Sequence, residues 1–439
     1  MNINFDKYQN IINNTHLTRD SGKVTEVTGL LIKGYVPGVS VGSICEIQTT
    51  ASNTPILAEV VGFKDRQVLM MSLGGMRGIS MGSKIILSKS IATVKVSDEL
   101  LGRVVDGLGQ PLDQGAEIEI TNEVSLYGEV VNPLQRKPIR EPLDVGVRAI
   151  NAALTTGRGQ RVAIMAGSGV GKSVLMGMMA KQTEADVNVI ALVGERGREV
   201  REFIENELGP EGMKKTVVVC VTSDQSPLLR MRGAFVATAI AEYFAHSGKK
   251  VLLVMDSVTR FAMAMREIGL SIGEPPSTRG YTPSVFSTLP KLLERAGNFE
   301  GAGSITGFYT TLVESDDMND PIGDAVRSIV DGHIVLSRSL AQRGHFPAID
   351  LLQSASRVMK AVSSPEHVRM AQKLREVLAT YREAEDLINV GAYKAGANPK
   401  IDKAIKLIDA INEFLCQKTD DYSNMNQCLR SLAQITVGS

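Results

Sequence analysis

Three short stretches of the sequence carry residues that could act together on a phosphate ester. The first is AGSGVGKS, residues 166–173, which follows an apolar strand-like run and precedes a helix-like one. In this context glycines let backbone N–H groups converge on phosphate oxygens, and the start of the helix adds the positive end of its dipole. Lys172 is expected to reach the outer phosphates, and the Ser173 hydroxyl to bind Mg²⁺. The residues expected to surround the phosphates are Gly167, Ser168, Gly169, Val170, Gly171, Lys172, Ser173 and Val174.

The second stretch is KVLLVMDS, residues 250–257. It predicts an apolar strand that delivers Asp256 at its carboxyl end, which is where open α/β sheets bind ligands. A carboxylate at this place can hold Mg²⁺ through the water shell of the ion. Strand-terminal Asp residues are common, so Asp256 alone is a weak signal. It indicates a metal site only because the same sheet also carries the phosphate loop.

The third stretch is GERGRE, residues 194–199, which follows the apolar run VNVIALV. Near-continuous apolar runs of this kind are typical of strands in a parallel sheet. We expect Glu195, at the end of such a strand, to orient the water that attacks the γ-phosphate and to act as its general base. Taken alone, the hexapeptide would fit a solvated surface turn better, and the catalytic interpretation depends on its place in the sheet.

These stretches need a scaffold that brings the ends of several strands together. From about residue 157 to 349, strand-like runs alternate with helical ones, which predicts βαβ units and a parallel sheet with helices on both faces. Lys172, Asp256 and Glu195 should then surround one pocket. The expected strands are RVAIMA, VNVIALV, KTVVVCVTS, KVLLVMDS and SITGFYTTLV, and the expected helices are VLMGMMAKQ, VREFIENEL and GAFVATAIAEYFAHSG.

Two further domains flank this α/β region. From about Gly22 to Leu87, short β-rich runs alternate with glycine turns, which indicates a small β-barrel. From about Ser364, apolar residues such as Met370 and Leu374 recur at helical spacing, which indicates a helical C-terminal domain. The predicted organisation is a polar tail over residues 1–20, a barrel over 21–92, the α/β domain over 93–360 and the helical domain over 361–439.

The composition argues against several other classes of protein. Lys plus Arg number 48 and Asp plus Glu number 48, so the net charge is zero, whereas dedicated nucleic-acid binders usually carry a basic excess. We therefore expect no nucleic acid as partner. The four cysteines have no CxxC spacing, which is typical of reduced thiols in a cytoplasmic protein. MNINFDKYQN has no apolar signal core, and the longest apolar runs are far below the ~20 residues that span a bilayer.

Longer stretches of the chain resemble one family. LVGERGREVREFIENELG, MDSVTRFAMAMREIGLSIGEPPSTRGYTPSVFSTLPKLLERAG and HFPAIDLLQSASRVM are similar to the export ATPases of flagellar and virulence type III secretion, which resemble the catalytic subunits of rotary F- and V-type ATPases. TSDQSPLLRMRGAFVATAIAEYF and EDLINVGAYKAGANPKIDKAI favour the flagellar branch over the virulence branch. The resemblance implies a RecA-like P-loop sheet between the barrel and the helical domain. It also implies a protein-secreting ATPase that uses ATP and Mg²⁺.

The resemblance implies catalytic roles for several residues. Glu195 matches the catalytic carboxylate, and Arg196 beside it matches a residue near the γ-phosphate. Arg260 in DSVTR matches another arginine on the phosphate side. Arg357 in SASRV matches the arginine finger, which a neighbouring subunit inserts into the site. The plain alternative for Arg260 and Arg357 is a surface ion pair.

Two residues are implied to lie near the adenine base. Phe346 in HFPAID matches the aromatic residue that stacks on adenine, although it could also be an ordinary core residue. Tyr393 in VGAYKAG is a second and weaker match.

One chain carries both Glu195 and Arg357, so identical subunits in a head-to-tail ring could form a complete site at every interface. The family implies six subunits. The loop over residues 269–286, rich in Gly, Pro and Ser, is implied to contact a coiled-coil central stalk. The other implied partners are a peripheral stalk or regulator protein, export-gate membrane proteins and chaperone–cargo complexes. The implied location is cytoplasmic, with peripheral attachment to the membrane-embedded export apparatus.

Two other readings stay open at this point. A RecA-like hexameric translocase on RNA or DNA would share the phosphate loop and the strand-end Asp, but the neutral charge and the lack of Trp argue against it. A non-catalytic nucleotide-binding ring subunit would be expected to lack Glu195.

Overall fold

The computed structural model describes residues 21–49, 54–128, 131–301, 303–313 and 320–437. The expected polar tail over residues 1–20 lies outside these ranges. The chain divides into two compact units, of which the first comprises Met1–Thr93 with Glu267–Glu274 and the second Val94–Arg266 with Pro275–Ser439. None of the helices in the described ranges is both long and apolar enough to cross a membrane.

The first unit contains a closed barrel in which the strands follow the order β1-β2-β5-β4-β3-β6. Neighbouring strands are antiparallel, and alternating apolar residues such as Val24, Ile32, Ile47 and Met70 fill the interior. The expected β-barrel is therefore confirmed. Its strands are β1 (Ser21–Thr28), β2 (Leu31–Tyr35), β3 (Ile44–Ile47), β4 (Ile56–Lys64), β5 (Gln67–Ser72) and β6 (Lys84–Lys89).

The second unit is built on a sheet in the order β19-β18-β12-β17-β15-β13-β14-β8, with β16 beside β17. All pairs are parallel except those of β16 and β19, which are short antiparallel additions. The expected parallel sheet is thus present. Its strands are β8 (Val104–Val105), β12 (Arg161–Ala166), β13 (Val187–Glu195), β14 (Thr216–Thr222), β15 (Lys250–Asp256), β16 (Gly297–Asn298), β17 (Ser304–Leu312), β18 (Gly332–Leu336) and β19 (Ala355–Ser356), and the separate pairs are β7 (Thr93–Val96) with β9 (Asn122–Ser125) and β10 (Pro142–Leu143) with β11 (Thr156–Gly157).

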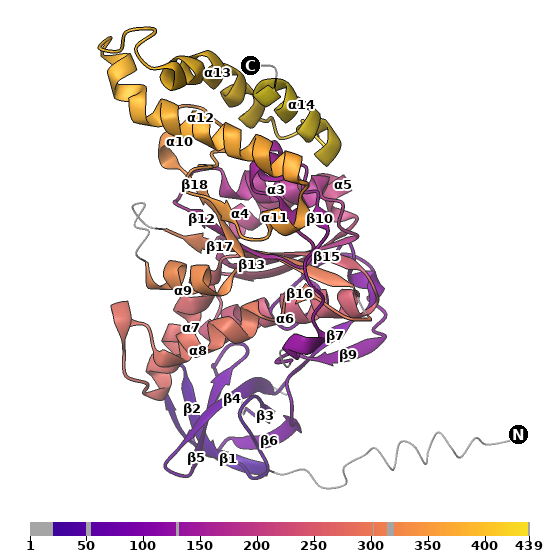
Figure 1. Ribbon diagram of the computed structural model, residues 1–439. Coiled ribbons are helices and arrows are strands. Elements are labelled where there is room, and N and C mark those ends of the chain that lie inside the picture. Colours follow the sequence, from indigo (N-terminus) through magenta and orange to yellow (C-terminus); the bar gives the residue numbers. More distant parts are fainter. Residues whose placement is uncertain (1–20, 50–53, 129–130, 302, 314–319, 438–439) are drawn as a thin grey trace, which may run out of the picture. The chain divides into compact units, whose positions relative to one another are not determined.

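Helices cover both faces of this sheet, with α3, α4 and α5 on one side and α6 and α8 on the other (Figure 1). α6 begins at Pro227, six residues before the expected stretch, because the Ser226 hydroxyl accepts from the backbone N of Leu229 and caps it. The helices are α2 (Arg148–Ala153), α3 (Lys172–Gln182), α4 (Gly197–Glu202), a π-helical turn (Phe203–Leu208), α5 (Gly209–Met213), α6 (Pro227–His246), α7 (Val258–Ile272), α8 (Pro283–Leu293), α9 (Pro321–Ile329), α10 (Arg338–Gln342) and α11 (Met359–Val362).

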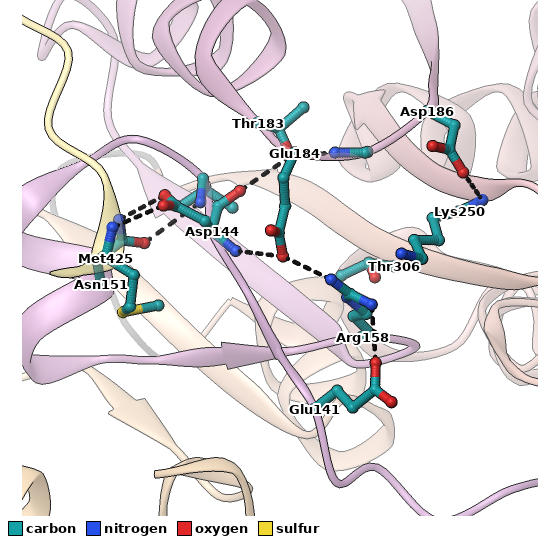
Figure 2. A network of polar contacts seen from close by, with 12 residues as sticks. Glu141, Asp144, Asn151, Arg158, Thr183, Glu184, Asp186, Lys250, Thr306 and Met425 are labelled. Carbon is teal, nitrogen blue, oxygen red and sulfur yellow. Dashed lines mark hydrogen bonds and ion pairs between the residues drawn. The ribbon is translucent and has the colours of Figure 1, made fainter.

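The chain ends in the expected helical region, α12 (Pro365–Asn389), α13 (Pro399–Leu415) and α14 (Met425–Val437). Polar contacts fasten these helices to the α/β part of the same unit. The Asp144 carboxylate accepts from the Asn151 side chain at 2.7 Å and from the backbone N of Met425 at 2.7 Å, where α14 begins (Figure 2). His367 is buried, and its Nε2 lies 2.8 Å from the Ala152 carbonyl oxygen.

Candidate nucleotide-binding and catalytic site

The loop between β12 and α3 has the backbone of a phosphate-binding loop. Gly169 and Gly171 adopt φ values of +76° and +87°, a region that favours glycine over every other residue. Gly171 is the residue before α3, so the N-terminus of an eleven-residue helix points its free N–H groups toward the loop. The residues from Gly167 to Ser173 therefore present backbone donors where phosphate oxygens can be held.

Behind the loop, the strands bring together the charged residues that the sequence singled out. Lys172 Nζ donates to Asp256 Oδ1 at the carboxyl end of β15, and it lies 3.8 Å from Glu195 Oε1 at the end of β13. The side chains of these residues are only 12, 3 and 15% exposed, in the order Lys172, Asp256 and Glu195. Their strands are not adjacent to β12, because β17 lies between β12 and β15.

β17 supplies a residue that sequence reasoning missed. Thr310 is fully buried, and its hydroxyl donates to Asp256 Oδ1 at 2.6 Å. This hydrogen bond fixes the orientation of the Asp256 carboxylate, because the carboxylate is buried and water has little access to it. A hydroxyl residue near the carboxyl end of the run SITGFYTTLV was the one signal for it, but Thr is so common in strands that it carried no weight.

Glu195 has the electrostatics of a proton acceptor. Burial, reinforced by the negative charge of Asp256, raises the pKa of Glu195 from its ordinary value of 4.5 to about 7, although the Lys172 ammonium acts in the opposite direction. Glu199 also raises the pKa of Glu195. A carboxylate whose pKa is close to neutral can take a proton from water and release it again under physiological conditions.

A cavity of about 200 Å³ adjoins these groups, and its polar lining is dominated by carboxylate and hydroxyl oxygens. Such oxygens suit Mg²⁺, which keeps several waters and is usually held by one or two protein groups together with phosphates. Ser173 and Asp256, the two residues that the sequence predicts to hold the ion, both line this cavity, and their binding of Mg²⁺ stays a prediction.

Arg260 and Phe346 also lie at this edge of the sheet. The Arg260 side chain packs against Gly194, where an added Cβ would lie 3.0 Å from Arg260 Cβ. The Nε atom of Arg260 is buried and has no hydrogen-bond partner among the described residues. Phe346 is 45% exposed and lies beside the loop. A Cβ added to Gly171 would lie 3.5 Å from Cδ1 of the Phe346 ring, which is ordinary van der Waals contact. Both placements suit a group that contacts a bound nucleotide.

Arg196 and Tyr393 contact other groups. The Arg196 side chain is 79% exposed, and its Nη1 donates to Glu199 Oε1 at 3.2 Å. The Tyr393 hydroxyl closes the loop between α12 and α13, where it donates to Asp402 Oδ1 at 2.9 Å and accepts from the backbone N of Asn398. Among the described residues, no hydrogen bond or ion pair links Tyr393 to the phosphate loop.

Arg357 lies at the opposite edge of the sheet, where the parallel strands begin. It follows β19, whose Ser356 pairs with Gly332 at the start of β18. The Arg357 side chain is exposed, with Nη2 3.4 Å from the Arg327 carbonyl oxygen. A strand of six residues, the length of β12, spans roughly 20 Å. Arg357 therefore lies far from the phosphate loop of its own chain, and its role as an arginine finger stays a prediction.

Comparison with known proteins places each part of the chain in one family. Residues 146–356 match the nucleotide-binding domain of the ATP synthase alpha/beta family, and residues 24–88 match the β-barrel domain of that family. Residues 363–434 match the C-terminal domain of the type III secretion ATPase EscN.

Individual relatives cover almost the whole chain. The flagellum-specific ATP synthase of Bacillus subtilis is 52% identical over 94% of this chain and 95% of its own length. The solved structure of the assembled ATPase EscN from the type III secretion system of enteropathogenic E. coli is 47% identical, with a TM-score of 0.89 over 94% of this chain and 100% of that one. EscN in complex with its central stalk EscO gives a TM-score of 0.88 at 45% identity, with the same coverage. With its phosphate loop, barrel and C-terminal helices each matched in turn, this chain belongs to the ATP synthase alpha/beta family, among the flagellum-specific and type III secretion ATPases.

Proposed function

We propose that this chain is a Mg²⁺-dependent ATP hydrolase that energises protein export through the flagellar apparatus, and that it works as a ring of six identical copies. The observation that carries the proposal is the contact of Lys172 with Asp256 and Glu195, two carboxylates that line one cavity with Ser173 of the phosphate loop. The relative with 52% identity is a flagellum-specific enzyme, which supports the flagellar system over a virulence system.

In this proposal each residue acts on one part of the reaction. Lys172 exchanges its bond with Asp256 for the β- and γ-phosphates, and backbone N–H groups of the loop hold the remaining oxygens. Ser173 and Asp256 would hold Mg²⁺, and the ion would supply positive charge beside the phosphates. Glu195 orients the attacking water and takes its proton, which its raised pKa allows. Arg260 on the same edge supplies positive charge to the transferring phosphoryl group, and Phe346 offers its exposed ring to the base.

The placement of Arg357 supports a ring. Because Arg357 lies at the edge of the sheet opposite Lys172, a head-to-tail contact between two copies brings the arginine of one to the phosphate loop of the other. The assembled state of EscN and its complex with a central stalk support a ring and a stalk partner for this chain. We extend the proposal to a peripheral stalk or regulator, export-gate membrane proteins and chaperone–cargo complexes on the strength of family membership.

The test separates binding from hydrolysis. Lys172→Ala should weaken ATP binding about 10- to 100-fold, because a charged hydrogen bond is worth about 1.5–3 kcal/mol. Glu195→Gln should bind ATP with near-normal affinity yet hydrolyse it about 10²- to 10⁴-fold more slowly, since it lacks the general base. Fluorescent-nucleotide titration and phosphate release measure the two quantities. Glu205→Gln, which removes the same charge from an exposed pair with Arg201, is the matched control and should behave as wild type. Wild-type turnover by Glu195→Gln would refute the proposal.

A further inference from the structure

The backbone of Arg357 is anchored by Asp331, a residue that the proposed reaction leaves without a role. The backbone N of Arg357 donates to the Asp331 carbonyl oxygen at 2.9 Å. Asp331 lies between α9 and the first residue of β18, at the edge of the sheet where the parallel strands begin. The position of Arg357 therefore depends on the position of Asp331.

Asp331 is in turn bound to Arg161 through both its backbone and its side chain. The backbone N of Asp331 donates to the Arg161 carbonyl oxygen at 2.8 Å. Arg161 in turn donates three hydrogen bonds to the Asp331 carboxylate. These run from Nε to Oδ2 at 3.0 Å, from Nη2 to Oδ1 at 3.2 Å and from the backbone N to Oδ2 at 3.2 Å. A planar guanidinium and a carboxylate joined by two parallel bonds define orientation as well as distance. Arg161 is the first residue of β12, so Asp331 is fixed to the strand that carries the phosphate loop at its other end.

Gln160 adds a buried link to the same group. Its Nε2 donates to the Asp331 carbonyl oxygen at 3.0 Å and lies 3.3 Å from Ser356 Oγ, the hydroxyl of the residue before Arg357. Its Oε1 accepts from the backbone N of Gly157 at 2.8 Å. Gln160 has no exposed surface, so all of its polar atoms serve this local network.

A second carboxylate, that of Glu294, also binds Arg161. Glu294, the residue directly after α8, forms an ion pair with Nη1 of Arg161. Arg136 holds Glu294 through a hydrogen bond to its carbonyl oxygen and through a second ion pair at 3.7 Å. Arg161 thus has a carboxylate on two sides, and its guanidinium is held in one orientation.

Arg357 combines this anchored backbone with a side chain that extends into solvent. Its one described side-chain bond, to the Arg327 carbonyl oxygen at 3.4 Å, is long and weak. An arginine that only stabilised its own chain would gain from a close carboxylate partner. A fixed backbone with a free guanidinium is what a group needs if it must reach an atom on another molecule at a defined place.

We propose that Gln160, Arg161 and Asp331 are positioning residues that set where Arg357 enters the active site of the neighbouring copy. This inference rests on the proposed function, since it assumes that Arg357 acts between subunits. It predicts that disturbing the group lowers kcat and leaves nucleotide binding by the same chain intact, because the phosphate loop lies at the other edge of the sheet.

The experiment uses Asp331→Ala, which removes one of the two carboxylates that hold Arg161 and breaks the side-chain link between Asp331 and β12. We expect kcat for ATP hydrolysis to fall roughly 10- to 100-fold, with KM and fluorescent-nucleotide affinity close to wild type. Asp331→Asn keeps an acceptor for Arg161 and should retain more activity than Asp331→Ala. Glu141→Ala, which removes an exposed ion pair with Arg158 at the same edge of the sheet, should leave kcat unchanged.

Subunit mixing identifies which half of the site is damaged. Rings of Asp331→Ala mixed with Glu195→Gln should regain activity, because about a quarter of the interfaces in an equal random mixture join an intact Glu195 to an Arg357 whose Asp331 is intact. Rings of Asp331→Ala mixed with Arg357→Ala should stay inactive. A chain that merely misfolded would rescue neither partner, so rescue by Glu195→Gln excludes a general structural defect.

The control mixture is Arg357→Ala with Glu195→Gln, with mixed rings verified by two affinity tags. If this control fails to regain activity, the proposal that two subunits share each site is wrong, and the positioning role that rests on it is wrong too. If the control succeeds, two results overturn the positioning role alone. These are wild-type kcat for Asp331→Ala, and a defect in Asp331→Ala that Glu195→Gln does not rescue.

Discussion

At the scale of single residues, the chemistry was easier to predict than the contacts that tune it. The phosphate-loop motif and the apolar strands singled out Lys172, Asp256 and Glu195, and the structure brings Lys172 into contact with the two carboxylates, which line one cavity. Thr310 was missed because a hydroxyl residue in a strand has no distinctive pattern. Tyr393 bonds within its own loop, and only three-dimensional contacts could reveal this. A sequence motif records which groups take part, whereas partners that lie far apart along the chain leave no local trace.

The raised pKa of Glu195 leads to a prediction about pH. A carboxylic acid with a pKa of about 7 binds its proton below pH 7 and cannot then act as a base, so kcat/KM should fall as pH decreases through 7. Well below that point the decline should approach about tenfold per pH unit, which steady-state kinetics from about pH 5.5 to about pH 8.5 would measure. Glu195→Gln should lose this limb of the profile. A midpoint near 4.5, the ordinary value for glutamate, would contradict the role of burial.

At the scale of elements, apolar runs located the strands well. RVAIMA coincides with β12, and KVLLVMDS extends only one residue beyond β15, since strands buried on both faces have few polar residues to blur their ends. The short strand β19 was missed because two residues, Ala355 and Ser356, carry no periodicity. The helical C-terminal region was predicted from its apolar spacing, but its attachment was not. That attachment uses polar residues such as Arg375, which donates to the carbonyl oxygens of Ser354 and Ala153.

The buried His367 in α12 contributes to this attachment, and its contribution can be tested through the pH dependence of stability. Burial lowers the pKa of His367 below its ordinary 6.5, although the bond to the Ala152 carbonyl oxygen acts the other way. Below pH 6.5 the unfolded chain therefore binds a proton that the folded chain resists, and the free energy of unfolding should fall by up to about 1.4 kcal/mol per pH unit.

Thermal unfolding at pH values from about 7.5 down to about 5.5 measures this dependence. His367→Gln keeps a donor for the Ala152 carbonyl oxygen but cannot titrate, so its melting temperature should fall less steeply with acidity than that of the wild type. Parallel curves for the two proteins would show that His367 contributes nothing to the pH dependence.

At the scale of the whole molecule, the sheet separates the two halves of the proposed site. Lys172 and Glu195 lie where the parallel strands end, and Arg357 lies where they begin. The sequence predicted that both halves belong to one chain type. It could not show that they occupy opposite edges, because this depends on the antiparallel turn of β19 against β18, which brings Arg357 back beside Asp331.

This separation predicts that activity depends on assembly. ATPase activity of the purified chain should rise more than linearly with protein concentration, because isolated copies lack Arg357 from a neighbour. Arg357→Ala should lose this increase and show a constant low specific activity. Added RNA or DNA should change neither result. Specific activity that is independent of concentration over a range in which light scattering shows the chain passing from monomer to ring would argue against shared sites.

α3 begins at the phosphate loop and ends against the C-terminal region. Its last residue, Gln182, donates to the Thr419 carbonyl oxygen at 3.1 Å, and Lys181 lies 4.0 Å from Asp420. Eleven helical residues form a rod about 16 Å long that resists compression along its axis. α3 thus connects the phosphate loop at its first residue with the segment between α13 and α14 at its last residue. Because α3 is one continuous helix between these contacts, we expect a displacement of the phosphate loop to reach the segment between α13 and α14.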